Sequence, residues 1–415
     1  MSQRYPNQVR NLLEVFGLVE IEFQRRRPID VYLTRHFRAN GKFGSRDRKF
    51  ISNAIFGYYR WYGWLREIEG RGTEFRLLLA YLLENGPVTD LIRFWSRQVG
   101  LDSGLLTAFG CDGKLDFDGK FHLLKRFYPH LSPNRLNPEF VPSWTAERIV
   151  HFQTRPNLWV RSVGSQCDGL KRFLQERSVD YSVHPGCPHS IEIKKSLSLK
   201  ECDDFQSGEI EIQDISSQAV GLICAPRPED CWWDVCAGSG GKSLHLASLM
   251  RGTGIVYATD VRKGALKELK RRNRRKRFTI VARHWDGENV PNFHHPLDGI
   301  LVDAPCSCSG TWRRAPELRW NTTLAMVREY AAMQLRILSN AARAYPQVPV
   351  IVYATCSVFP EENEQVVSRF LERFPAYSPT SITNPLTGAV SDGSLHLGPP
   401  ELNGNSTFVA RLARK

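Results

Sequence analysis

The chain has 415 residues, a length that predicts two or three domains. Its 42% hydrophobic and 24% charged residues exclude the disordered and fibrous classes, and no apolar run approaches the ~20 residues that a membrane span requires. The net charge of +13 favours a polyanionic partner, nucleic acid first, although a need for solubility would also explain it.

The N-terminal part, residues 1–140, is predicted to form a helical domain. Residues 12–19 place apolar side chains on one helical face, and residues 75–83 are nearly all apolar, as in a buried helix. Residues 48–65 mix basic and aromatic side chains, a combination that could grip or stack on RNA. We expect the aromatics of this segment to pack in a core, and leave phosphate contact open for its arginines.

A proline-rich stretch ends the helical pattern, with Pro129, Pro133, Pro138 and Pro142 close together. Such a cluster predicts a linker or an irregular crossing. Beyond it, residues 158–163 fit a strand, residues 169–177 fit a short helix, and further short segments fit strands. We therefore predict a small α+β module over residues 141–220.

The C-terminal part, residues 221–415, has the pattern of an α/β domain. Strands are expected at 231–236, 254–260, 278–283, 299–303 and 348–355, with a long helix over 323–345. Alternating strands and helices predict a mostly parallel sheet with helices on both faces. Ligands of such sheets bind at the carboxyl ends of the strands. Here those ends carry Gly, Asp and Cys residues, as expected for one shared site.

A glycine-rich turn, residues 234–243, follows the first of these strands and opens a helix, so its backbone can approach a ligand closely. A dinucleotide fingerprint needs G-x-G-x-x-G/A, but Ser243 stands at its third position. A phosphate-binding P-loop needs a first glycine where Cys236 stands, which disfavours a nucleotide-hydrolysing enzyme. S-adenosylmethionine has no phosphates and needs only such a turn and a carboxylate for its ribose.

Two aspartates at successive strand ends favour that cofactor. Asp260 is placed to bind the ribose hydroxyls, and Asp286 could orient the adenine. A lone aspartate at a strand end is more often a helix cap, but two in one sheet favour a ligand. The predicted cofactor-binding residues are Cys236, Ala237, Gly238, Ser239, Gly240, Gly241, Lys242, Asp260, Asp286 and Asp303.

The ten cysteines include no CxxC pair with matching distant ligands, so we predict no metal site. The N-terminus lacks the apolar stretch of a secretory signal, and we expect a cytoplasmic protein whose thiols stay reduced. Cys306 and Cys308 are two residues apart. If their segment leaves a strand, their side chains can point in different directions and need not share a role.

Two motifs at the fourth and fifth predicted strands are recognisable. The run Asp-Ala-Pro-Cys-Ser at 303–307, the run Thr-Cys-Ser at 355–357 with the Glu-Glu-Asn that follows at 361–363, and the glycine-rich turn resemble the NOL1/NOP2/Sun family of RNA 5-methylcytosine methyltransferases. Residues 208–220 resemble the family's entry into its catalytic domain, so the likeness covers residues 208–415. The upstream regions resemble, more weakly, the NusB-like and RNA-recognition-like domains of the bacterial 16S ribosomal RNA member.

The resemblance implies methyl transfer from S-adenosylmethionine to C5 of a cytosine in RNA. Small-subunit ribosomal RNA is the expected substrate, and transfer RNA is the alternative. The family's chemistry implies Cys356 as the nucleophile that adds to C6, with Cys306 assisting proton removal and product release. Asp303 is implied to hydrogen-bond the cytosine edge, and Lys242 to bind the donor's carboxylate or support the turn. A non-catalytic RNA-binding assembly factor with the same fold is the alternative of a different class.

The chain departs from the family pattern in three places. Gly238 and Ser239 replace the usual Ala-Pro in the turn, Cys308 stands where the family usually has Gly or Ala, and residues 405–411 are a worn version of its final strand. Neither of the two family cysteines is affected. Either cysteine taken alone would have a buried structural role as its ordinary explanation.

Basic residues near these motifs are the candidates for RNA contact. The target base must leave its stack to reach the site, so the flanking phosphates need partners. We predict contacts from Arg313, Arg314, Lys270, Arg271 and Arg272. A solvated helix face explains the basic run at 267–277 equally well. We expect a monomer that acts on RNA and has no membrane partner.

Overall fold

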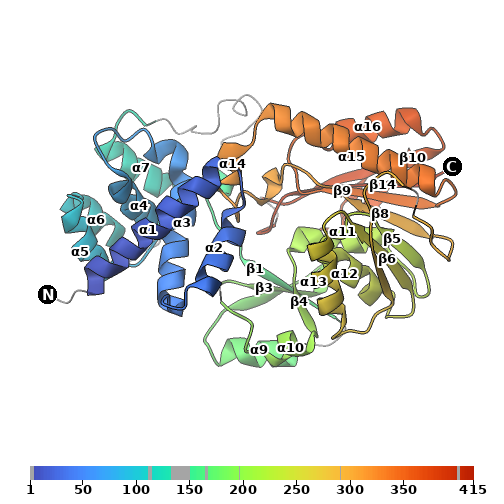
Figure 1. The fold of residues 1–415 in the computed structure, drawn as a ribbon, viewed down its shortest axis with the longest axis horizontal. Coiled ribbons are helices and arrows are strands. Elements are labelled where there is room, and N and C mark those ends of the chain that lie inside the picture. The colour runs from blue at the N-terminus through green and yellow to red at the C-terminus, as the bar shows by residue number, and fades with distance from the viewer. Residues whose placement is uncertain are drawn as a thin grey trace. The chain divides into compact units, whose positions relative to one another are not determined.

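A computed structural model describes residues 4–110, 115–131, 150–163, 167–195, 197–289, 291–399 and 402–415. The chain divides into two compact units (Figure 1). One comprises Met1–Arg155 with Trp312–Thr323, and the other Pro156–Thr311 with Leu324–Lys415. Pro133, Pro138 and Pro142 of the expected linker lie outside the described residues.

The first unit is helical, as predicted. Its helices are α1 (Arg4–Gln24), α2 (Ile29–Ala39), α3 (Ser45–Leu65), α4 (Thr73–Leu83), α5 (Asp90–Gln98), α6 (Ser103–Gly110), α7 (Phe117–Phe127) and α14 (Leu318–Asn321). Helix α4 is buried from Leu77 to Leu83, which explains its nearly unbroken apolar sequence. Tyr59 and Trp61 of α3 are buried in the core, and Phe56 is half-buried.

Segment Trp312–Thr323 joins this helical unit although it comes from the C-terminal half of the sequence. The indole of Trp320 donates to the carbonyl of Tyr59 at 2.6 Å, and the guanidinium of Arg60 donates to the carbonyl of Arg313 at 2.6 Å. Arg60 is buried and also pairs with Glu84 at 3.2 Å. These long-range contacts tie the segment to α3.

The second unit begins with a small α+β module. Its antiparallel sheet has the order β2-β3-β1-β4, with β1 (Leu158–Ser162), β2 (Tyr181–His184), β3 (Cys187–Ile193) and β4 (Ile210–Ile212). Helices α9 (Asp168–Gln175) and α10 (Asp203–Ser207) complete it. Val160, Ile191 and Ile193 of the sheet form one buried cluster with Leu170 and Leu174 of α9. The module thus has a core of its own.

The remainder is a mostly parallel sheet, as the alternating pattern predicted. Among its described strands, five are parallel: β5 (Cys231–Asp234), β6 (Ile255–Asp260), β7 (Ile280–His284), β8 (Gly299–Asp303) and β9 (Val350–Thr355). Three strands join the sheet in antiparallel pairs: β10 (Tyr377–Pro379), β13 (Ser394–Leu397) and β14 (Thr407–Arg414). The order is β10-β14-β9-β8-β5-β6-β7, with β13 on β14. Strands β11 (Ile382–Thr383) and β12 (Val390–Ser391) form a separate pair.

Helices cover both faces of this sheet (Figure 1). Helices α15 (Leu324–Ala344) and α16 (Glu364–Arg373) pack on the face that carries Trp233 and Val302. Helices α11 (Ile215–Cys224) and α12 (Gly241–Leu249) pack on the face that carries Trp232 and Leu301. Helix α13 (Lys263–Asn273) packs beside α12. Burial on both faces explains why the strands are continuous apolar runs.

The strand order reverses direction between β5 and β8. The chain runs from β5 to β6 and β7 on one side, then returns to β8 and β9 on the other. Ligands of open α/β sheets bind in the crevice at such a switch point, at the carboxyl ends of the strands. Among the helices that the structure describes, none has the length and apolar character that a membrane crossing requires.

Gly299 provides a test of the packing at the centre of the sheet. A Cβ built on it would lie 2.5 Å from the ring of the buried Trp232, so we expect Gly299→Ala to lower the free energy of unfolding by about 1–3 kcal/mol. Gly264→Ala in α13 is the matched control, because a Cβ there meets no atom within 4 Å and alanine favours helix. Thermal unfolding followed by circular dichroism compares the two, and equal midpoints would contradict the packing described.

Candidate active site

The glycine-rich turn between β5 and α12 depends on two left-handed glycines. Gly238 has φ 56° and Gly240 has φ 87°, a region that glycine occupies without strain. A Cβ on Gly240 would also lie 2.1 Å from Leu269 of α13. Glycine at 238 suits the turn, because alanine adopts this left-handed conformation less readily.

Asp260 holds this turn from the end of β6. Its carboxylate accepts the backbone N–H of Gly238 at 2.8 Å and two guanidinium N–H groups of Arg262 at 3.0 and 3.1 Å. Burial would raise the pKa of Asp260, but the bonds from Arg262 and Gly238 outweigh it and lower that pKa. Asp260 is thus an ionised group at the edge of the turn.

Asp286 lies just past the end of β7, the strand that pairs with β6. It is exposed beyond β7, and its carboxylate accepts the N–H groups of Glu288 and Asn289 at 2.9 and 3.2 Å. These bonds cap a local turn. The neighbouring residue Trp285 donates its backbone N–H to the carbonyl of Asp260 at 3.3 Å, so Asp286 lies at the same edge of the sheet as Asp260. A role in binding the adenine stays a prediction.

A cavity of about 320 Å³ opens at the carboxyl ends of the strands. Lys242 of the first turn of α12, Asp303 at the end of β8 and Cys356 just after β9 line it together. The other lining residues are Ile212, Gln213, Asp214, Ser216, Ser217, Ser239, Gly241, Arg272, Asn405 and Thr407. The sequence analysis did not single out the polar residues of α11 and β14 among these. The family-like segments at 208–220 and 405–411 were the signal that could have indicated them.

The cavity contains an ion pair. The Nζ atom of Lys242 lies 2.6 Å from Oδ2 of Asp303. Burial would lower the pKa of Lys242, but the Asp303 carboxylate outweighs it and raises that pKa. Burial raises the pKa of Asp303 and Lys242 opposes this shift. The Asp303 side chain is 31% exposed, so water reaches the carboxylate and stabilises its charged form. Lys242 and Asp303 therefore form an ion pair.

The two family cysteines face one another across neighbouring loops. Cys306 follows β8 and Cys356 follows β9, and their Sγ atoms are 3.2 Å apart. The N–H of Gly310 donates to the carbonyl of Cys356 at 2.9 Å, which fastens one loop to the other. A Cβ on Gly310 would lie 2.0 Å from the carbonyl oxygen of Ser406, so this close approach requires glycine.

Glu362 is a buried residue that holds both cysteine loops. It accepts the backbone N–H of Ser307 at 2.8 Å, its hydroxyl at 2.5 Å, and the hydroxyl of Ser357. Gln334 of α15 donates to it at 3.0 Å and to the carbonyl of Pro305 at 2.9 Å. Burial raises the pKa of Glu362 and these bonds oppose the shift. The sequence motif contained Glu362, but only the fold reveals this role.

The predicted RNA-contacting arginines separate into two groups. Arg313 is 3% exposed and donates to the carbonyl and hydroxyl oxygens of Thr154 at 3.1 and 2.9 Å within the helical unit. The prediction that Arg313 grips phosphate is therefore corrected, because its guanidinium is buried. Arg314 is exposed.

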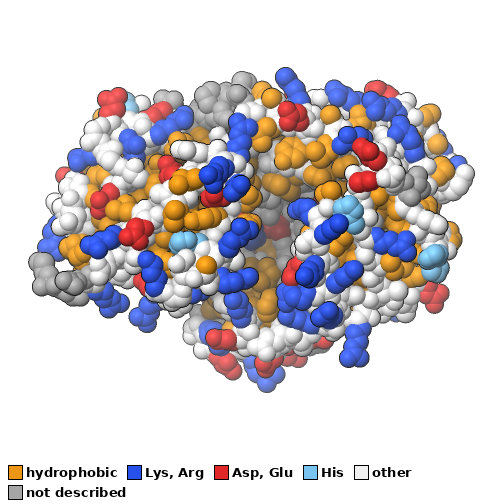
Figure 2. Space-filling view, viewed as in Figure 1, with side chains coloured by type: hydrophobic (Ala, Val, Ile, Leu, Met, Phe, Trp, Pro, Cys, Tyr) orange, Lys and Arg blue, Asp and Glu red, His pale blue; other side chains and the backbone are white. Residues whose placement is uncertain are grey.

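The basic residues of α13 lie beside the cavity. Lys270 is exposed, and Arg271 pairs with Glu268 at 2.6 Å. Arg272 pairs with Glu211 of the small module at 2.6 Å and donates to the carbonyl of Ser239 at 2.9 Å. Lys and Arg side chains gather over α13 on the molecular surface (Figure 2).

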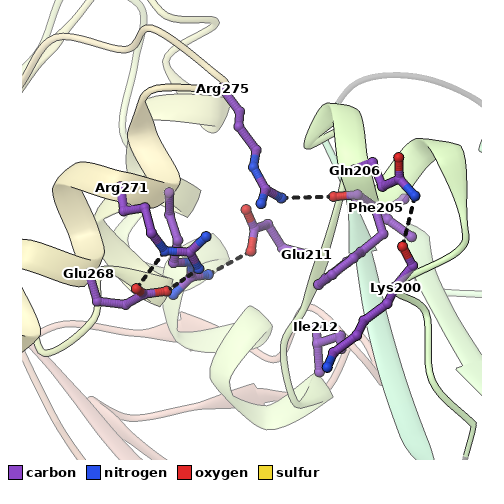
Figure 3. Close-up of a pocket in the computed structure, with 10 residues that line it drawn as sticks. Lys200, Phe205, Gln206, Glu211, Ile212, Glu268, Arg271 and Arg275 are labelled. Carbon is purple, nitrogen blue, oxygen red and sulfur yellow. Dashed lines mark hydrogen bonds and ion pairs between the residues drawn. The ribbon is translucent and has the colours of Figure 1, made fainter.

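A groove of about 500 Å³ separates α13 from the small module. Figure 3 shows Glu268 and Arg271 on one side, with Phe205, Gln206 and Ile212 on the other. The remaining lining residues are Lys200, Ile210, Glu211, Arg272 and Arg275. Ile212 and Arg272 also line the Cys356 cavity, so groove and cavity adjoin.

Comparison with known proteins gives a consistent result. A family model described as 16S rRNA methyltransferase RsmB/F matches residues 221–413. A protein of Synechocystis sp. named "Probable ribosomal RNA small subunit methyltransferase B" is 30% identical over 297 residues, which span 68% of this chain and 66% of that relative.

Solved structures share the fold. PH0851 superimposes with a TM-score of 0.73 at 22% identity and covers 99% of both chains. NSun6 from Pyrococcus horikoshii, solved with SFG, superimposes with a TM-score of 0.56 at 16% identity over 64% of this chain and 92% of its own. At these identities the likeness establishes the fold alone.

Asp234 predicts a pH dependence of stability. It is buried at the end of β5, accepts the Ser243 hydroxyl at 2.6 Å, and burial raises its pKa to about 7. An unfolded aspartate has a pKa of about 3.9. The raised folded pKa means that stability is fully present below about pH 4 and is lost as the pH rises to about 7.

Asp234→Asn cannot ionise, so its stability relative to the wild type is expected to rise by roughly 1–3 kcal/mol between pH 5 and pH 7. Urea unfolding at several pH values measures this difference. If the free energy of unfolding changed with pH in the same way for the variant and the wild type, Asp234 would not be the source of the pH dependence.

Proposed function

The chain belongs to the RsmB/F family of 16S ribosomal RNA methyltransferases, which use S-adenosylmethionine, and we propose that it methylates C5 of a cytosine in small-subunit ribosomal RNA. The observation that supports this most is the pairing of Cys306 and Cys356 at a cavity that also contains Lys242 and Asp303. A nucleophilic thiol, a second thiol and a polar group for the base are what the covalent chemistry requires. A monomeric, cytoplasmic enzyme remains our expectation for its state and location.

The turn and cavity fit S-adenosylmethionine. A Cβ on Gly241 would meet no atom within 4 Å, so the turn is open on the side that lines the cavity. The Lys242 ammonium and the Asp303 carboxylate suit the carboxylate and ammonium of the donor's amino-acid end. Asp260 offers a carboxylate at the next strand end. Bound there, the cofactor would supply an electrophilic methyl group.

Cys356 is the proposed nucleophile. Its thiolate would add to C6 of the cytosine, and the electron pair displaced from the C5–C6 double bond would make C5 nucleophilic. The Cys306 hydrogen bond favours the Cys356 thiolate, but the contact with Cys308 and burial raise the pKa of Cys356 above that of a free thiol. A thiol at Cys356 must release its proton to solvent before attack, because the thiolate is the nucleophile.

Asp303 and Cys306 complete the proposed reaction. The Asp303 carboxylate would accept a hydrogen bond from the cytosine edge, at the N4 amino group and at N3 once N3 takes up a proton in the adduct. Cys306 would first give its own proton to solvent. After the methyl group reaches C5, the Cys306 thiolate would accept the C5 proton while the electron pair of the C5–H bond restores the double bond and the Cys356–C6 bond breaks, releasing the Cys356 thiolate. The 3.2 Å separation of the two sulfurs places both within reach of one base.

This division of labour predicts different effects for the two cysteines. Cys356→Ser is expected to lose methyl transfer, whereas Cys306→Ala is expected to accumulate a covalent protein–RNA adduct. Incubation with tritiated S-adenosylmethionine and 16S ribosomal RNA, with bisulfite mapping of 5-methylcytosine, measures the first effect, and a denaturing gel measures the second. The adduct should disappear in Cys306→Ala with Cys356→Ser.

The results of these two measurements distinguish the proposed function from its alternatives. No label above the Cys356→Ser background on any RNA would favour a non-catalytic RNA-binding protein. Label on transfer RNA alone would replace the ribosomal substrate while leaving the chemistry intact. Cys306→Ala protein that remains free would count against its release role.

The groove beside α13 supports contact with a single RNA strand next to the target base. Arg271, Arg275 and Lys200 offer charge for phosphates, and Ile212, 45% exposed, offers an apolar surface for a base. Arg272 lies at the boundary with the Cys356 cavity. A base in the cavity would thus leave its flanking nucleotides in the groove.

Removing charge from the groove should weaken RNA binding. Arg271→Ala combined with Lys200→Ala is expected to raise the Kd about tenfold and to reduce the salt dependence by roughly one to two ion contacts. Arg369→Ala and Arg373→Ala on α16 remove the same charge outside the groove and serve as the control. Fluorescence anisotropy with labelled RNA at several salt concentrations measures the Kd of both double variants. Equal losses of affinity would show that net charge alone explains the effect.

A further inference from the structure

A third thiol lies beside the two family cysteines. The Sγ atoms of Cys306, Cys308 and Cys356 all lie within 4.8 Å of one another. Cys308 also contacts the carbonyl oxygen of Cys306 at 3.5 Å. The side chains of Cys306 and Cys308 therefore converge, which the sequence analysis left open. Methyl transfer by two cysteines makes no use of this third sulfur.

The backbone at Cys308 is held in an unfavourable conformation. Its φ is 55°, in the left-handed region that costs a non-glycine residue roughly 1 kcal/mol. Hydrogen bonds from the backbone N–H and the hydroxyl of Thr311 to the Cys308 carbonyl, at 2.9 and 2.8 Å, fix the turn. This conformation directs the third sulfur toward the other two.

We propose that the three sulfurs form a binding site for a thiophilic divalent cation, with Zn²⁺ as the representative ion. Zinc binds thiolate sulfur at about 2.3 Å in tetrahedral geometry, so three ligand sulfurs would be about 3.8 Å apart. The observed separations, from 3.2 Å to at most 4.8 Å, surround that value. Small side-chain rotations would suffice to bind the ion.

The charge balance of the site suits such an ion. Binding would release to solvent the protons that the thiols carry and form three metal–sulfur bonds. A divalent cation with three thiolates has a net charge of −1. The Lys242 ammonium, which lines the same cavity as Cys356, would offset this charge. Cys308 and Cys356 are partly exposed, so an ion can reach the sulfurs.

Metal binding would occupy the proposed nucleophile. A Cys356 sulfur that is bonded to the cation is not available to add to C6 of the cytosine. The cation would therefore inhibit methyl transfer reversibly. Binding itself does not depend on the proposed function, but inhibition rests on the proposed role of Cys356. Cys308 would determine the affinity, because two thiols hold such an ion less tightly than three.

Cadmium and zinc titrations of the reduced full-length protein without RNA test the site. We expect the ultraviolet charge-transfer band of cadmium thiolate to saturate at one ion per chain. Cys308→Gly suits the left-handed φ and removes one ligand, so its affinity should be at least tenfold weaker. Cys224→Ala, a buried cysteine of α11 outside the cluster, is the matched control and should bind as the wild type does.

Activity provides the second measurement, as the ratio of methyl transfer with and without zinc within each variant. Zinc should inhibit the wild type, a chelator should restore it, and Cys308→Gly should need a higher zinc concentration. The proposal is overturned if no charge-transfer band forms, or if Cys308→Gly binds cadmium as tightly as the wild type. A metal-binding protein that is inactive in the metal-free state would instead refute the proposed function and leave the site intact.

Discussion

The parallel pairing of β8 with β9 is the constraint on which the site depends. Asp303 lies in register with Ala354, so the two strands end together at one edge of the sheet. The loops that follow must therefore emerge side by side, although Cys306 and Cys356 are fifty residues apart in the chain. Hydrophobic burial on both faces of the sheet stabilises this register, because a shift by one residue would turn every side chain toward the wrong face.

Hydrogen bonds hold the buried carboxyl groups near the ends of the parallel strands and offset the free-energy cost of removing these groups from water. Asp234, Asp260 and Glu362 are all buried carboxyls near the strand ends. Asp260 stays ionised because Arg262 and Gly238 donate to it, whereas burial raises the pKa of Asp234 and Glu362. The buried acceptor Glu362 receives donors from both cysteine loops and so links them.

The basic character of the chain is only partly available to RNA. Arg60, Arg313 and Arg319 are buried in the helical unit, and Arg161 is buried in the small module beside Gln213. Burial lowers the pKa of Arg319 to about 9 and that of Arg161 to about 10. These arginines count toward the net charge but contribute to packing. Basic side chains of α13 and the groove are among those that can meet phosphate.

The sequence alone determined the fold class, the strands of the parallel sheet and the motifs at their ends, because hydrophobic period and glycine turns are local properties. Through the family resemblance it also indicated Cys306, Cys356, Asp303 and Lys242, which the structure brings to one edge. Only the tertiary structure decided that Arg313 is buried, that Asp286 caps its own turn, and that Cys308 faces the other thiols. The neighbours of a loop side chain come from distant segments, and a linear pattern contains no record of them.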